Sequence, residues 1–104
     1  MRTGENMIVE NDGATSVLLR RAPTRGEVMT EIVTQLAPFR GDDSQVIRGE
    51  TVISKDLAID SLAVMDMVME LEDRFDVSIP MNAVAEIQTV DELADTILKL
   101  AARR

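Results

Sequence analysis

The chain has 104 residues, 45% of them apolar, and this length and composition predict one small globular domain. It contains no cysteine and no histidine, which excludes disulfides, thiolate metal sites and a Ser-His-Asp triad within the chain. The formal net charge of −8 argues against nucleic-acid binding and favours protein partners with basic surfaces.

Residues 1–23 mix Gly, Asn, Thr and charged residues without a sustained period, which predicts a flexible N-terminal extension. Acidic residues and the lack of an apolar h-region in this segment argue against a signal or transit peptide. No apolar run in the chain approaches the roughly 20 residues that span a bilayer. A cytoplasmic monomer without membrane insertion is therefore expected.

The first predicted helix begins at Thr24, which forms a capping box with Glu27. The apolar residues that follow have the spacing of one helical face. They are Val28, Met29, Ile32, Val33 and Leu36. Pro38 is expected to end this helix, because the residue before a proline is disfavoured in α geometry.

Residues 39–59 form a long connection to the next helix. A structureless loop of this length is unusual in a small domain. We therefore expect the loop to pack on the core, with room for a short helical turn. The apolar residues expected to attach it are Val46, Ile47, Val52, Ile53 and Leu57.

The second long helix is predicted from about Ser61 to Phe75 and carries two apolar stripes. On a helical wheel, one stripe forms a coherent core face. Its members are Val64, Met67, Val68, Leu71 and Phe75. The second stripe is Leu62, Met65 and Met69, flanked by the acids Asp66, Glu72, Asp73 and Asp76. Two interpretations remain open for it: the edge of a wide core face, with Met as filler, or an exposed surface that binds partner proteins.

After an extended break at residues 77–79, Pro80–Ile87 is predicted to be a short helix with proline in its first position. A second capping box, Thr89 with Glu92, opens the last helix. Its apolar face is Val90, Leu93, Ala94, Ile97, Leu98 and Ala101. The predicted fold is all-α: a small antiparallel bundle of three main helices and one short helix over residues 24–102, followed by a tail at 103–104.

Ser61 lies at the predicted start of the second long helix, without a histidine to activate it. Only Lys55 and Lys99 are available as lysine bases, and nothing in the sequence indicates burial of either, so an enzyme is not expected. An external enzyme could instead attach a phosphate group to Ser61, since the helix N-terminus favours an anion there. Asp60 would then cap the helix or help to position the donor. In the simpler interpretation, Asp60 or Ser61 is only an N-cap.

The string "LAIDSLAVMDMVMELEDRFDVSIP", followed by a short helix and "TVDELADTIL", resembles the acyl carrier proteins over about residues 24–102. The resemblance implies that a phosphopantetheinyl transferase attaches 4′-phosphopantetheine from coenzyme A to Ser61. It also implies that the thiol of this arm carries an acyl chain as a thioester. Further partners would be enzymes of the acyl-ACP synthetase, ketosynthase or acyltransferase type.

The resemblance also assigns roles to the two stripes of the second helix. The residues that match the family's partner-docking face are Leu62, Met65, Asp66, Met69 and Asp73. The residues that would line the interior, where related carriers shelter the acyl chain, are Val64, Met67, Val68, Leu71, Phe75 and Ile79.

Three features depart from the common family pattern. Two are the residues Ala58 and Ala63, and the third is a short helix whose only acid is Glu86. Together with the N-terminal extension, they favour a specialised carrier of a lipid or secondary metabolic pathway over general fatty acid biosynthesis. Two alternatives stay open. One is a peptidyl or aminoacyl carrier, and the other is a non-catalytic helical adaptor.

Overall fold

The computed structural model describes residues 22–103, and most of the predicted N-terminal extension lies outside this range. The described residues form five α-helices and one 3-10 helix, with no strand among them. The elements are α3 (Arg25–Leu36), η1 (Ala37–Phe39), α4 (Ile53–Asp56), α5 (Ser61–Phe75), α6 (Met81–Glu86) and α7 (Val90–Ala102). The predicted all-α bundle is confirmed.

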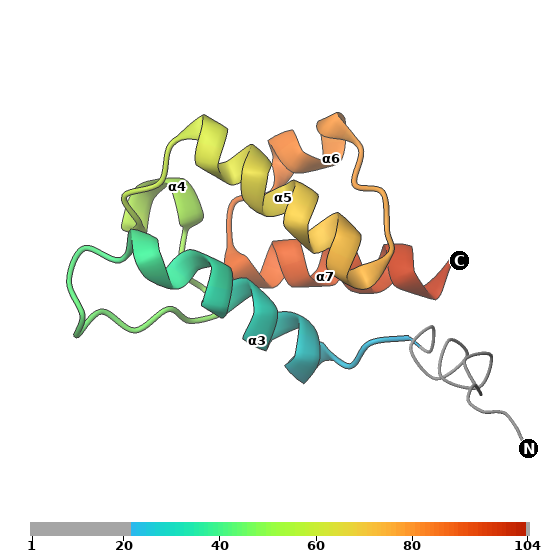
Figure 1. The fold of residues 1–104 in the computed structure, drawn as a ribbon, viewed down its shortest axis with the longest axis horizontal. Coiled ribbons are helices and arrows are strands. Elements are labelled where there is room, and N and C mark those ends of the chain that lie inside the picture. The colour runs from blue at the N-terminus through green and yellow to red at the C-terminus, as the bar shows by residue number, and fades with distance from the viewer. Residues whose placement is uncertain (1–21, 104) are drawn as a thin grey trace, which may run out of the picture.

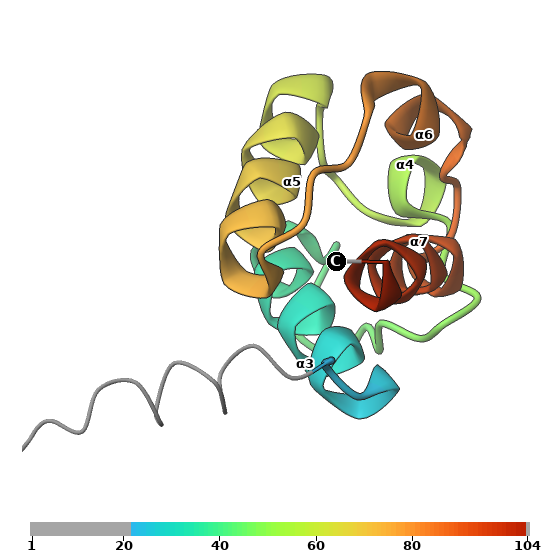
Figure 2. The same ribbon diagram turned by 90° about the vertical axis from the view of Figure 1, so that its right-hand side faces the viewer.

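The three long helices surround a common core, and α4 and α6 close its remaining side (Figure 2). Figure 1 shows that α3 runs antiparallel to both α5 and α7. Figure 2 shows the short helix α6 next to α4, across the bundle from α5, and from α6 the chain returns to the start of α7. Within residues 22–103, no helix is long and apolar enough to cross a membrane.

The first helix, α3, begins with the predicted capping box. The hydroxyl of Thr24 accepts a hydrogen bond from the Glu27 N–H at 3.1 Å, and the Glu27 carboxylate accepts one from the Thr24 N–H at 2.8 Å. The most buried members of its apolar face are Val28, Ile32 and Leu36. The α-helix ends at Leu36, but the chain continues through Pro38 as η1, because the fixed φ of proline also suits a 3-10 turn.

The long connection packs on the bundle as expected, and α4 is its short helical turn. Ile53 and Leu57 are buried, whereas Ile47 and Val52 are partly buried. The prediction for Val46 is wrong, since this side chain is 63% exposed.

Backbone hydrogen bonds hold the connection against the start of α7. The N–H of Ile53 donates to the carbonyl of Gln88 at 2.9 Å, and the N–H of Val90 donates to the carbonyl of Thr51 at 3.1 Å. These polar contacts hold the loop in place without a contribution from Val46, which explains why an apolar residue there stays exposed.

The last two helices follow the predicted order with one small shift. Pro80 is the N-cap of α6 and lies one residue before its first helical position. In α7, the capping box of Thr89 and Glu92 is present. The backbone N–H groups of Thr89 and Gln88 hold the pKa of the Glu92 carboxyl below its ordinary value. The buried residues of α7 are Val90, Leu93, Ala94, Ile97 and Ala101, whereas Leu98 is half-buried.

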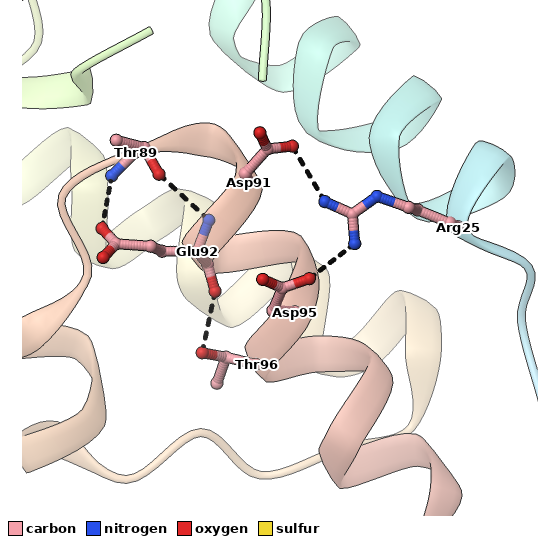
Figure 3. A network of polar contacts seen from close by, with 6 residues as sticks. All are labelled: Arg25, Thr89, Asp91, Glu92, Asp95 and Thr96. Atoms are coloured by element: carbon pink, nitrogen blue, oxygen red, sulfur yellow. Dashed lines mark hydrogen bonds and ion pairs between the residues drawn. The ribbon is translucent and has the colours of Figure 1, made fainter. Parts of the chain in front are cut away.

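An ion-pair cluster joins the beginning of α3 to α7 (Figure 3). The Arg25 guanidinium contacts Asp91 at 2.8 Å and Asp95 at 2.5 Å, one helical turn apart on α7. Hydrogen bonds to these carboxylates raise the pKa of Arg25. Gly49 lies so close to the Asp91 carboxylate that a Cβ atom would overlap it. The first turns of α3 and α7 are thereby held together.

Candidate functional site

The N-terminus of α5 is capped by Asp60. Its Oδ1 accepts a hydrogen bond from the Ala63 N–H at 2.8 Å, and its carbonyl accepts one from the Val64 N–H at 3.0 Å. Of the two capping residues considered from the sequence, the structure therefore uses Asp60. The extended backbone of Asp60, with φ −96° and ψ 175°, is typical of an N-cap.

Ser61 is the first helical residue of α5, and it is exposed. Among residues 22–103, its hydroxyl has no hydrogen-bond partner, because the adjacent cap is already supplied by Asp60. The N–H groups of Ser61 and Leu62 are the first two of the helix and have no acceptor in this range. A phosphate ester on the Ser61 hydroxyl would thus meet free N–H donors and the positive end of the helix dipole.

The second apolar stripe of α5 faces solvent for most of its length. Leu62 is 71% exposed and Met69 is 53% exposed, whereas Met65 is half-buried. Asp66 and Asp73 are exposed beside them. The interpretation of this stripe as the edge of a wide core face is therefore wrong for Leu62 and Met69. We refer to these five residues as the α5 outer face.

Glu72 differs from the other acids that were predicted to flank this stripe. Its carboxylate accepts a hydrogen bond from the backbone N–H of Ile79 at 2.7 Å, in a partly buried position. Its carbonyl accepts the N–H groups of Asp76 and Val77 at the end of the helix. Glu72 thus ties the segment after α5 to the helix, and its carboxylate is not available as a solvated docking charge.

The other stripe of α5 is the core face. Met67, Val68 and Leu71 are buried, and Val64 and Phe75 are partly buried and pack against the core. Ile79, in the segment after α5, is 6% exposed and also belongs to the core. All six residues that the resemblance placed in the interior therefore contact or belong to the core cluster.

A pocket of about 100 Å³ opens between α5 and the three helices α4, α6 and α7. Its lining residues are Ile53, Ser54, Val64, Met67, Val68, Val84, Ile87 and Leu93. Only Val64, Met67 and Val68 of the six predicted interior residues line it. Val64 lies three positions after Ser61 and so on the same side of the helix, which places the pocket one turn from the serine.

Sequence reasoning did not assign the other five lining residues to a pocket. Ile53 and Leu93 were expected only to pack, and Val84 and Ile87 belong to the predicted short helix. Ser54 has no sequence signal at all, since a serine in a charged loop is unremarkable. The pocket depends on the position of α4 and α6 against α5, which a single helix pattern does not contain.

Comparisons with known proteins identify the family of this chain. A family model described as the phosphopantetheine attachment site matches residues 30–97. The chain belongs to the acyl carrier protein family. An acyl carrier protein of Chlorobium phaeovibrioides is 34% identical over 76 residues, which are 73% of this chain and 97% of the relative. A probable acyl carrier protein of Caulobacter vibrioides is 47% identical over 57 residues, which are 55% of this chain and 66% of the relative.

A solved structure resembles this acyl carrier protein as well. It is the solution structure of the acetyl actinorhodin acyl carrier protein from Streptomyces coelicolor, with a TM-score of 0.59 and 26% sequence identity. The match covers 81% of this chain and 96% of that one. Members of this family are carriers and not catalysts, and they hold 4′-phosphopantetheine covalently on a serine.

Proposed function

We propose that Ser61 is the residue to which 4′-phosphopantetheine is attached, and that the protein delivers acyl groups to the enzymes of a lipid or secondary metabolic pathway. The arm supplies a terminal thiol on which an acyl group is held as a thioester. The observation that carries the proposal is that Asp60 and Ser61 have different roles at the start of α5. Asp60 caps the helix, which leaves the Ser61 hydroxyl exposed and unpaired among the described residues.

The α5 outer face provides the matching surface for partner enzymes. Exposed Leu62 and Met69 offer flexible apolar contacts, and Asp66 and Asp73 attract basic surfaces. Because this face begins next to Ser61, a partner that docks on it has the attachment residue at its edge. The partners expected here are a phosphopantetheinyl transferase and then acyl-ACP synthetase, ketosynthase or acyltransferase enzymes.

Attachment is tested by incubation with coenzyme A, Mg²⁺ and a promiscuous phosphopantetheinyl transferase. The intact mass should increase by one phosphopantetheine group. The Ser61→Ala variant should stay unmodified, whereas Ser78→Ala, which removes another exposed serine, should be modified like the wild type. Equal modification of Ser61→Ala, or none of the wild type, contradicts the proposal and favours the helical adaptor.

The peptidyl carrier alternative uses the same arm and differs in its cargo. The acidic surface and the acetyl carrier among the similar structures support acyl cargo. Loading assays with an acyl-ACP synthetase and with an amino-acid adenylation domain distinguish the two. Transfer of amino acids but not of acyl groups would establish the alternative.

A further inference from the structure

The pocket beside α5 is apolar except at one position. Seven of its eight lining residues have aliphatic or thioether side chains, and Ser54 on α4 is the eighth. Among residues 22–103, the hydroxyl of Ser54 has no hydrogen-bond partner. A single unpaired hydroxyl in an apolar pocket orients a ligand through one hydrogen bond.

The depth of each lining residue shows where this hydroxyl lies. Met67, Val68 and Leu93 form the floor and are 4%, 3% and 1% exposed. Ser54 is exposed and therefore lies at the rim. Water hydrates its hydroxyl while the pocket is open, but a ligand that covers the rim removes that water. The lost hydrogen bond then costs free energy unless the ligand replaces it.

The size of the pocket limits the ligand. A dry cavity of about 150 Å³ accepts benzene, which has six carbon atoms. By the same proportion, the 100 Å³ of this pocket accommodates about four carbons. A short acyl chain fills it, whereas a long one leaves much of its length outside.

The direction of entry follows from the position of Ser61. A chain tethered there enters with its terminal carbons first, so the carbons next to the thioester remain at the rim, close to Ser54. If Ser61 carries the arm as proposed above, we infer that the pocket prefers a short acyl group, of about four carbons, with a hydroxyl on its β-carbon. Ser54 forms a hydrogen bond with that hydroxyl and is a specificity-determining residue for the cargo.

A saturated acyl chain of the same length has no hydroxyl on its β-carbon to form a hydrogen bond with Ser54. When it covers the rim, the Ser54 hydroxyl loses its hydrogen bond to water without a replacement, which makes binding of this chain less favourable. A hydrogen bond between neutral groups has a net worth of about 1 kcal/mol, which is roughly a fivefold change in an equilibrium constant. Removal of the Ser54 hydroxyl should therefore change the ratio of thioester protection between the hydroxylated and the saturated acyl group by about fivefold.

The experiment measures how strongly the pocket protects the thioester from cleavage. The carrier is loaded with 3-hydroxybutyryl, butyryl or octanoyl groups, and its thioester is cleaved with hydroxylamine. Each rate is divided by that of the same acyl group on free pantetheine, which yields a protection factor. The variants are Ser54→Ala, the conservative Ser54→Thr and the control Ser78→Ala. Circular dichroism and thermal unfolding check that each remains folded.

The ratio of protection for 3-hydroxybutyryl over butyryl should fall about fivefold in Ser54→Ala and stay unchanged in Ser54→Thr and Ser78→Ala. An unchanged ratio in Ser54→Ala overturns the inference, as does an equal loss for both cargoes, which would place the bond on the thioester carbonyl. Stronger protection of octanoyl than of butyryl overturns the size limit. Failure of the arm to attach at Ser61 refutes the proposed function instead, and mass spectrometry reports this before any cargo is loaded.

Discussion

Replacement of Glu72 by alanine should destabilise the fold even though Glu72 lies on the acidic side of α5. Its carboxylate accepts the N–H of Ile79 at 2.7 Å, and Ile79 itself is 6% exposed. Alanine removes the acceptor and leaves this N–H beside the core without a partner. Glutamine keeps an acceptor oxygen on a side chain of the same length and removes only the charge.

The expected magnitude follows from the kind of bond that is lost. A hydrogen bond to a charged group is worth about 1.5 to 3 kcal/mol, and the partial burial of this one favours the lower part of that range. We therefore expect Glu72→Ala to lower the free energy of unfolding by about 2 kcal/mol. In a domain of this size, such a loss lowers Tm by roughly 8 to 16 °C. Glu72→Gln should lose less than half of this.

Urea unfolding followed by circular dichroism measures these differences. The matched control is Glu70→Ala, which makes the same replacement at an exposed position of the same helix. Both residue types have high helix propensity, so the control should unfold almost like the wild type. If Glu72→Ala and Glu70→Ala have the same stability within about 0.5 kcal/mol, the hydrogen bond to Ile79 does not hold the segment after α5.

Three further predictions concern the end of α5, its outer face and the start of α7. Asp76 has φ 55°, so Asp76→Val should destabilise by at least about 1 kcal/mol in urea unfolding while Asp76→Gly does not, and equal stabilities would refute the strain. Asp66→Lys should slow the phosphopantetheinyl transferase several-fold at low salt and flatten the salt dependence of its rate, whereas unchanged kinetics would remove Asp66 from the docking face. In the folded protein, the pKa of the Glu92 carboxyl lies below its ordinary value of 4.5. The ionised carboxylate therefore stabilises the fold at pH values above 4.5, and this stabilisation is lost as the pH falls through the folded pKa. Thermal unfolding from pH 7 to 3 should thus show a flatter Tm curve for Glu92→Gln, and a curve parallel to that of the wild type would contradict the assignment.

Local signals predicted the helix boundaries well. The two capping boxes, Thr24 with Glu27 and Thr89 with Glu92, start α3 and α7 where the sequence places them. A capping box joins groups only three residues apart, so its geometry is complete within one turn. Long-range contacts are different. Val46 was expected to pack and is exposed, because backbone bonds of residues 51–53 hold the connection without it.

At the candidate site too, local signals in the sequence were informative, whereas long-range contacts needed the structure. The order of Asp60 and Ser61 limited the choice of cap to two residues, but the hydrogen bond from Ala63 decided it. The helical wheel separated the two stripes of α5, but it ranked Glu72 with the solvated acids because it does not contain the returning chain at Ile79.

The sequence by itself determined which residues form the three long helices, that Ser61 lies at the start of the second one, and which family the chain resembles. These features depend on the spacing of neighbouring residues along one helix, and such spacing is present before the chain folds. Only the tertiary structure decided that the Ser61 hydroxyl has no partner among residues 22–103, that Leu62 and Met69 face solvent, and that Ser54 lies at the rim of an apolar pocket. A pocket needs walls from α4, α5, α6 and α7 at once, and their relative positions arise from packing across the bundle.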